Sequence, residues 1–173
     1  MKYLLKYLLI YANRIFGHSA PKMIGEFRLE RVLKLSNHPN YVLAIYKKHD
    51  TKYFAKIWQG VWHDLNYDQL QTEYQVITAL FAQLTKASDI RVPELVSKIE
   101  SPHQLALIYE YLDGKLLDSL PKARQNEIIT RVEAWLASLT PPLIHGDLTA
   151  DNIIVKDHYI YVLDWEKSKV ASV

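Results

Sequence analysis

The sequence predicts an α+β fold in which a sheet-rich first lobe precedes a smaller, mostly helical second lobe. Three observations support this prediction. Short runs of alternating apolar and polar residues, separated by turn signals, dominate the first two thirds of the chain and are typical of antiparallel strands. Two longer segments carry apolar residues at helical spacing, and a short apolar hairpin pattern follows the second of them. The boundary between the lobes is expected near Leu112 to Leu117.

Five extended segments define the first lobe. Each is rich in β-branched, aromatic or leucine residues and is bounded by residues that favour turns. The second and third flank His49 and Asp50, so the first three form an antiparallel meander, and the last two pair with each other. The expected strands are 26–34, 41–48, 51–58, 93–99 and 104–112, with another turn at 36–40 and a break at Gly114.

Two long helices complete the expected secondary structure. One spans 65–84 in the first lobe, and the other spans 121–139 in the second, where Pro141 and Pro142 end it. A helical turn at 116–120 precedes the second helix, and the tryptophans are expected to be packing residues. The apolar positions that define the helical faces are Leu70, Tyr74, Ile77, Leu80, Phe81 and Leu84 in the first, and Ile128, Ile129, Val132, Trp135 and Leu136 in the second.

The N-terminal residues form a separate amphipathic helix in this prediction. Lys2, Lys6 and Asn13 share one face, and the uncharged run Tyr7–Ala12 is far too short to span a bilayer. We expect this helix to dock on the protein's own core or on a partner, and peripheral contact with a membrane surface stays open as the alternative. The expected division of the chain is therefore 1–20 for this helix, 21–113 for the first lobe and 114–173 for the second.

The composition is that of an ordinary globular protein. Apolar residues make up 49% of the chain and charged residues 23%, and the net charge of +2 gives no reason to expect a nucleic-acid partner. There are no cysteines, which excludes disulfides and thiolate metal sites and agrees with a reducing cytoplasm. We therefore expect a cytoplasmic protein.

The most informative string is LIHGDLTADNIIVKDHYIYVLDWE. Asn152 and Asp164 flank the predicted hairpin, whose two strands would bring their side chains together. Amide and carboxylate oxygens of this kind suit Mg²⁺, particularly when phosphate groups supply the remaining ligands. Asp147 precedes them in a loop, where a carboxylate could orient an attacking hydroxyl or accept its proton.

The segment HGDLTADN resembles the catalytic loop of kinase-fold enzymes, in which His-x-Asp is followed by Asn five residues after the Asp. HGD together with LDWE is closer to the aminoglycoside phosphotransferase and choline kinase superfamily than to protein kinases, which carry HRD and DFG at these places. The resemblance implies a protein-kinase-like two-lobe fold, with an antiparallel β-sheet N-lobe and a minimal, truncated helical C-lobe. It also implies ATP and Mg²⁺ as cofactors.

The resemblance assigns roles to the residues of this string. Asp147 would be the catalytic base or the group that positions the hydroxyl, and Asn152 and Asp164 would be the magnesium ligands. His145 would brace the loop, and Glu166 would support the metal or the substrate side.

Other segments match the resemblance in the expected order. Lys56 in YFAKIW matches the strand lysine that contacts the nucleotide phosphates, and Glu73 matches the helix glutamate that pairs with it. LIYEYLDG resembles the hinge, with Tyr109 at the back of the nucleotide pocket and the backbones of Glu110 and Leu112 facing the adenine edge. The alternative, without a functional role, is that Lys56 is a solvated strand residue and Glu73 is a charged residue on the helix surface.

The expected activity is transfer of the γ-phosphoryl group of ATP to a hydroxyl of a small molecule, such as an antibiotic, a sugar, an amino alcohol or a lipid-linked glycan. Two departures from the family pattern keep alternatives open. The turn at 36–40 contains no glycine to approach the phosphates. Only nine residues follow Asp164, so we expect a minimal kinase, a fragment of one, or a chain that borrows its acceptor site from a partner protein. The alternatives are a nucleotide-binding pseudokinase or scaffold and a compact atypical protein kinase.

Overall fold

The computed structural model of the chain describes residues 20–35, 40–61, 63–84 and 88–171. The predicted N-terminal helix and all but the last residue of the turn at 36–40 lie outside these ranges. The chain forms two compact units, the first made of Met1–Leu70 and Leu95–Tyr111, and the second of Gln71–Glu94 and Leu112–Val173. The division falls inside the long first helix, whereas the sequence analysis assigned that whole helix to the first lobe.

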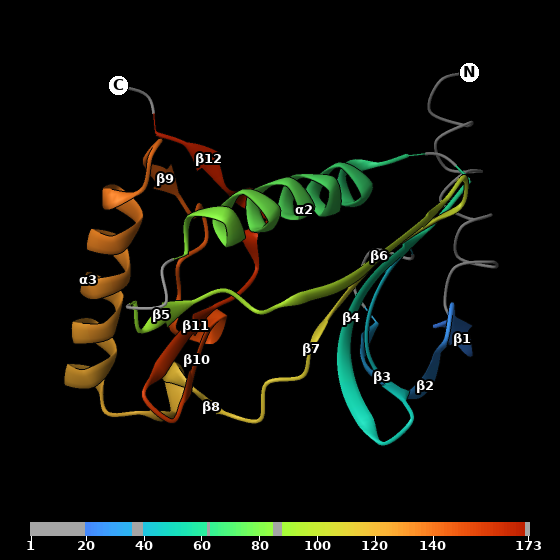
Figure 1. Ribbon diagram of the computed structural model, residues 1–173, viewed down its shortest axis with the longest axis horizontal. Helices are drawn as coiled ribbons and strands as arrows, with labels where there is room; N and C mark the ends of the chain where they lie inside the picture. The colour runs from blue at the N-terminus through green and yellow to red at the C-terminus, as the bar shows by residue number, and fades with distance from the viewer. Residues whose placement is uncertain (1–19, 36–39, 62, 85–87, 172–173) are drawn as a thin grey trace. The chain divides into compact units, whose positions relative to one another are not determined.

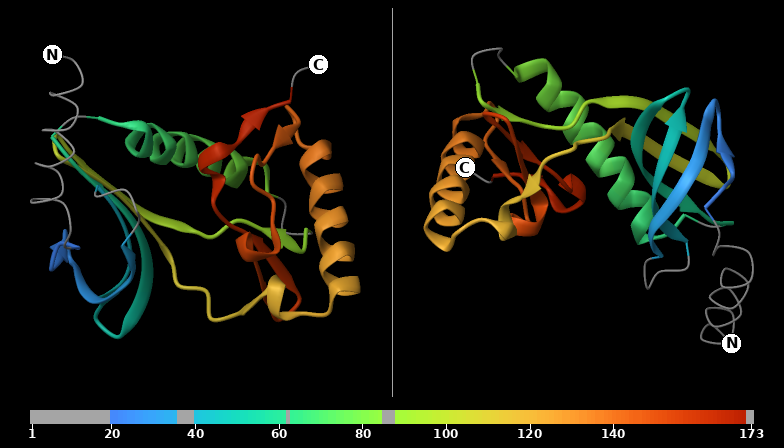
Figure 2. Two further views of the ribbon diagram at one scale, coloured as in Figure 1. Left: turned by 180° about the vertical axis from the view of Figure 1, so that it is seen from behind. Right: turned by 90° about the horizontal axis from the view of Figure 1, so that it is seen from below.

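The first unit contains a six-stranded antiparallel sheet in the order β1-β2-β3-β4-β7-β6. Strands β2, β3 and β4 form the predicted meander, and β7 pairs with both β4 and β6. The sheet is strongly curled, as Figures 1 and 2 show. Its strands are β1 (Met23–Ile24), β2 (Phe27–Leu35), β3 (Tyr41–Lys48), β4 (Thr51–Gln59), β6 (Leu95–Ser101) and β7 (Gln104–Glu110).

One face of this sheet carries an apolar core. Cross-strand neighbours such as Ala44, Ala55 and Ile108 are completely buried. Tyr46 is buried among them, and its hydroxyl donates a 2.7 Å hydrogen bond to the carbonyl of Pro21. Side chains alternate along a strand, so Lys56 projects from the opposite face of β4.

Helix α2 spans Leu65–Gln83 and begins at a side-chain cap. The Asp64 carboxylate accepts hydrogen bonds from the backbone N–H groups of Asn66 and Tyr67, at 3.0 and 3.2 Å. The same carboxylate accepts bonds from the Trp58 indole at 2.9 Å and from the Asn40 amide at 2.8 Å. One aspartate therefore fixes the start of the helix to strand β4 and to the residue that precedes β3.

The predicted apolar face of α2 is wrong at Phe81, which is 42% exposed. The buried positions of the helix are Leu70, Glu73, Ile77 and Leu80. At 100° per residue, Phe81 lies at the margin of the stripe that these four define. Glu73, which carries a charge, takes the place in the stripe that an apolar residue would normally hold.

The second unit contains two small sheets, helix α3 and the part of α2 that follows Leu70. Its four-stranded sheet has the order β5-β11-β10-β8, and a separate two-stranded sheet pairs β12 with β9. The predicted hairpin is present as β10 and β11, joined antiparallel from Ile153↔Val162 to Lys156↔Tyr159. The elements are β5 (Ile90–Arg91), β8 (Lys115–Leu116), η1 (Leu117–Ser119), α3 (Lys122–Ser138), β9 (Leu143–Ile144), η2 (Ala150–Asn152), β10 (Ile153–Lys156), β11 (Tyr159–Val162), η3 (Trp165–Lys167) and β12 (Lys169–Val170).

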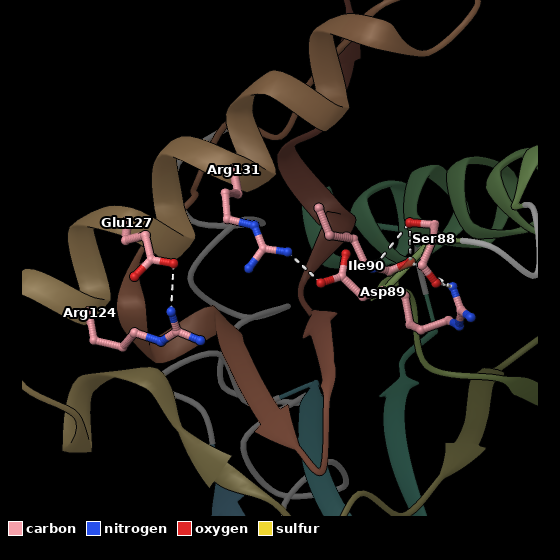
Figure 3. A network of polar contacts seen from close by, with 7 residues as sticks. Ser88, Asp89, Ile90, Arg124, Glu127 and Arg131 are labelled. Carbon is pink, nitrogen blue, oxygen red and sulfur yellow. Dashed lines mark hydrogen bonds and ion pairs between the residues drawn. The ribbon is translucent and has the colours of Figure 1, made fainter.

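Helix α3 packs through one stripe and is tied to β5 at its middle. Ile128, Val132 and Leu136 are buried, as predicted. The Arg131 guanidinium donates to the Asp89 carboxylate, which links the helix to the segment that leads into β5 (Figure 3). No helix within the described ranges is long and apolar enough to cross a membrane.

Candidate active site

The loop that contains HGD is organised around His145, which is only 2% exposed. Its Nε2 lies 2.8 Å from the carbonyl oxygen of Leu163, and its Nδ1 accepts a 3.3 Å hydrogen bond from the backbone N–H of Asp147. The ring also packs against Trp165, with 4.7 Å between centroids. Since Nδ1 accepts, Nε2 carries the proton and donates to Leu163. The imidazole thus joins the loop to Leu163, the residue that follows strand β11 of the hairpin.

The open end of the hairpin holds Asn152 and Asp164. The backbone N–H of Leu163 donates to the carbonyl of Asn152 at 2.8 Å, which continues the pairing one step past the strands. The Asn152 side-chain amide donates to the carbonyl of Asp147 at 2.9 Å, so its nitrogen is committed to the loop and its oxygen is the atom left for a cation.

Asp164 has an unusual backbone conformation. Its φ of 62° and ψ of 65° place it in the left-handed region, which a non-glycine residue occupies at a cost of about 1–2 kcal/mol. Such strain persists where the surrounding structure fixes the residue, and it is common at functional sites. Here the residue links β11 to η3, and the chain changes direction at Asp164.

Three carboxylates of the second unit converge. Oxygen atoms of Glu73, Asp164 and Glu166 all lie within 4.8 Å of one another. Glu73 is 2% exposed, which excludes the interpretation that it is a solvated surface charge. Carboxylates this close repel one another unless a cation or a proton separates them. The group therefore has the charge and the donor atoms of a site for a hard divalent cation.

Lys167 contacts a predicted site residue, and the sequence analysis did not include it. Its Nζ lies 2.7 Å from Oδ2 of Asp147. This hydrogen bond and the charge of Asp147 raise the pKa of Lys167, and Asp164 and Glu166 raise it further. The only signal in the sequence is its position three residues after Asp164, which does not by itself indicate a contact with Asp147.

The backbone next to Asp147 is in direct contact with the backbone next to Lys167. Strand β9 pairs with β12 through Ile144↔Lys169, and the Ser168 hydroxyl donates to the carbonyl of His145 at 3.2 Å. Gly146, between them, has a φ of +82°, and a Cβ built on it would lie 2.3 Å from the carbonyl oxygen of Lys167. Glycine is therefore required here by both the conformation and the close approach.

The comparison with family models agrees with this geometry. The model of a phosphotransferase enzyme family (APH) matches residues 58–173, which is more than half of the chain. The chain belongs to this phosphotransferase family. The matched range contains every residue of the second unit discussed above, from Glu73 to Lys167. A search of curated proteins returned no relative.

The remaining predicted residues of this phosphotransferase lie elsewhere in the fold. Lys56 and Glu110 belong to the first unit, and Leu112 begins the second segment of the second unit. Lys56 is only 6% exposed, between Leu43 and Leu107 of the neighbouring strands, so the interpretation of a solvated lysine is wrong. A buried lysine is rare and requires a compensating partner, which gives the position functional interest.

Proposed function

We propose that this phosphotransferase moves the γ-phosphoryl group of ATP to a hydroxyl of a small molecule, such as an antibiotic, a sugar, an amino alcohol or a lipid-linked glycan. Family membership supports the reaction type. The observation that supports the site is the arrangement at the end of the hairpin, where Asn152 is bonded to the backbone of Asp147 and Asp164 meets two further carboxylates.

The donor atoms fit Mg²⁺. This ion prefers carboxylate and amide oxygens and keeps several of its waters. Asn152 and Asp164 would be its protein ligands. Glu166, which belongs to the group of three carboxylates, would support the metal. When bound, Mg²⁺ would neutralise the charge that develops on the phosphate oxygens during transfer.

Nucleotide binding is assigned by the resemblance. Lys56 would contact the phosphates, and Glu73 would fix Lys56. The backbones of Glu110 and Leu112 would face the adenine edge. The burial of Lys56 and Glu73, each less than 10% exposed, supports these roles, because neither charge would be kept inside the protein without a partner.

Asp147 would act on the acceptor. The acceptor oxygen attacks the γ-phosphorus, a new P–O bond forms, the bond to the bridging β–γ oxygen breaks, and ADP leaves. The proton of the hydroxyl passes to the Asp147 carboxylate and then to solvent. His145 would keep the loop in place through its two hydrogen bonds to Asp147 and Leu163.

The test compares two aspartates of the same loop. The full chain is incubated with Mg²⁺, ATP and a panel of hydroxyl compounds, and ADP release is measured. Asp147→Asn is expected to lower kcat by about 10²–10⁴-fold, the usual contribution of a positioned acid or base, while the affinity for ATP is kept. Asp151→Asn is the matched control, because Asp151 is exposed in η2.

The outcomes separate the alternatives. Full activity of Asp147→Asn would end the assignment. ATP binding without turnover on any acceptor would favour a pseudokinase or scaffold, and transfer to protein alone would favour a compact atypical protein kinase. Adding candidate partner proteins to the assay tests whether one of them completes the acceptor site.

A further inference from the structure

We propose that Lys167 is a positioning residue of this active site, which holds the Asp147 carboxylate in the orientation that the acceptor hydroxyl requires. The inference rests on the proposed function. The Nζ–Oδ2 distance of 2.7 Å is that of a charge-assisted hydrogen bond. By engaging Oδ2, Lys167 would restrict rotation of the carboxylate and leave Oδ1 for the acceptor hydroxyl.

The main chain of Lys167 is held more firmly than that of an ordinary surface lysine. Trp165, two residues earlier, is completely buried, and its indole donates to the carbonyl of Val162 at 3.0 Å. The backbone N–H of Ser168 donates to the carbonyl of Trp165 at 3.1 Å, which closes the turn around Lys167. Together with the β9–β12 pairing and the contact at Gly146, these bonds set the base of the side chain opposite Asp147. Because Lys167 is held in place before the reaction, little conformational entropy is lost when it orients Asp147 during phosphoryl transfer.

The charge of Lys167 suits the reaction. A lysine ammonium is a cation throughout the neutral range, and this one lies 2.7 Å from Oδ2 of Asp147. During transfer, a negatively charged phosphoryl group must approach the Asp147 carboxylate, and the two would repel each other. A fixed cation beside the carboxylate reduces this repulsion without any rearrangement.

A merely structural role predicts a different result. Both side chains are partly exposed, Lys167 by 55% and Asp147 by 35%, and ion pairs between exposed groups contribute little to stability. Removing the ammonium group should therefore leave the fold intact. A large loss of turnover at unchanged melting temperature would report positioning.

The experiment compares Lys167→Met, which keeps most of the stem, with Lys167→Arg and with Lys169→Met. Lys169 is exposed on β12 and serves as the matched control. Lys167→Met is expected to lower kcat by about 10–100-fold, because small misplacements of a reacting group have effects of that size, and to leave the KM for ATP within about 2-fold. Lys167→Arg should recover most of the activity, and Lys169→Met should match the wild type.

Two further measurements separate positioning from other effects. In Lys167→Ala, added ethylammonium should restore turnover in proportion to its concentration, whereas tetramethylammonium, which cannot donate a hydrogen bond, should not. In an Asp147→Asn background, Lys167→Met should cause no further loss, because the two residues act as one unit. Additive losses, or full activity of Lys167→Met, would refute the role. If the wild type shows no turnover, the proposed function is refuted together with this role. That outcome differs from an active wild type whose Lys167→Met variant is fully active, which refutes the role of Lys167 alone.

Discussion

Replacing Gly146 by alanine tests whether the loop that contains HGD and the segment after Asp164 fit together as tightly as the structure indicates. A Cβ on residue 146 would lie 2.3 Å from the carbonyl oxygen of Lys167 and 2.9 Å from its carbonyl carbon. Both are main-chain atoms, so no side-chain rotation relieves the contact. The backbone of one segment has to move.

The expected cost has two parts. A non-glycine residue in the left-handed region costs about 1–2 kcal/mol. Forcing two backbone segments apart adds strain of order 1–3 kcal/mol, which gives a total of about 2–5 kcal/mol. Gly25→Ala provides the control, because Gly25 also has a positive φ, of +57°, but its Cβ would meet only the tip of Ile99, at 3.1 Å. That variant should lose only the first part.

The free energy of unfolding is measured for both variants by urea titration, followed by far-UV circular dichroism and tryptophan fluorescence. Gly146→Ala should also lower turnover more than Gly25→Ala, because the shift separates Lys167 from Asp147. Equal losses of stability in the two variants would refute the close approach at Gly146. A stable but inactive Gly146→Ala would mean that the loop moves at little cost.

Two other predictions concern the first unit. Burial raises the pKa of Tyr46, so the folded chain keeps a proton that the unfolded chain releases above about pH 10. The free energy of unfolding should therefore fall by about 1.4 kcal/mol for each pH unit above about pH 10. Tyr46→Phe should flatten this alkaline decline in urea titrations, and an unchanged decline in that variant would contradict the prediction. Asp64→Ala should cost about 2–4 kcal/mol, since it removes a helix cap and leaves the Trp58 indole and the Asn40 amide without their acceptor. A loss below about 1 kcal/mol would mean that water replaces the carboxylate.

Local sequence patterns predicted most of the fold. Alternation and turn residues located β3 and β4 within one residue, because antiparallel neighbours joined by short turns are specified locally. Strand β5 was missed, since its two residues pair in parallel with β11, about seventy positions later in the chain. The sequence of a two-residue strand does not indicate a partner so far away in the chain.

The sequence proposed a site only where its residues share one continuous string, and the roles of those residues stay predictions. The resemblance of this string to a kinase-type catalytic loop implied the roles of Asp147, Asn152 and Asp164. The structure shows a hydrogen bond from the Asn152 amide to the carbonyl of Asp147, and Asp164 at the end of the hairpin. Lys167 could not be found in this way, because its contact with Asp147 depends on the pairing of β9 with β12 and on the absence of a side chain at Gly146. Those are properties of the folded backbone.

The second unit is discontinuous in sequence, and this limits how the protein can be dissected. Its segments Gln71–Glu94 and Leu112–Val173 are separated by two strands of the first unit. A fragment starting at residue 112 would keep Asp147, Asn152 and Asp164 but lose Glu73 and the edge strand β5. Isolating the second unit would therefore need complementation between two peptides or a circular permutation, and a single cleavage could not yield it.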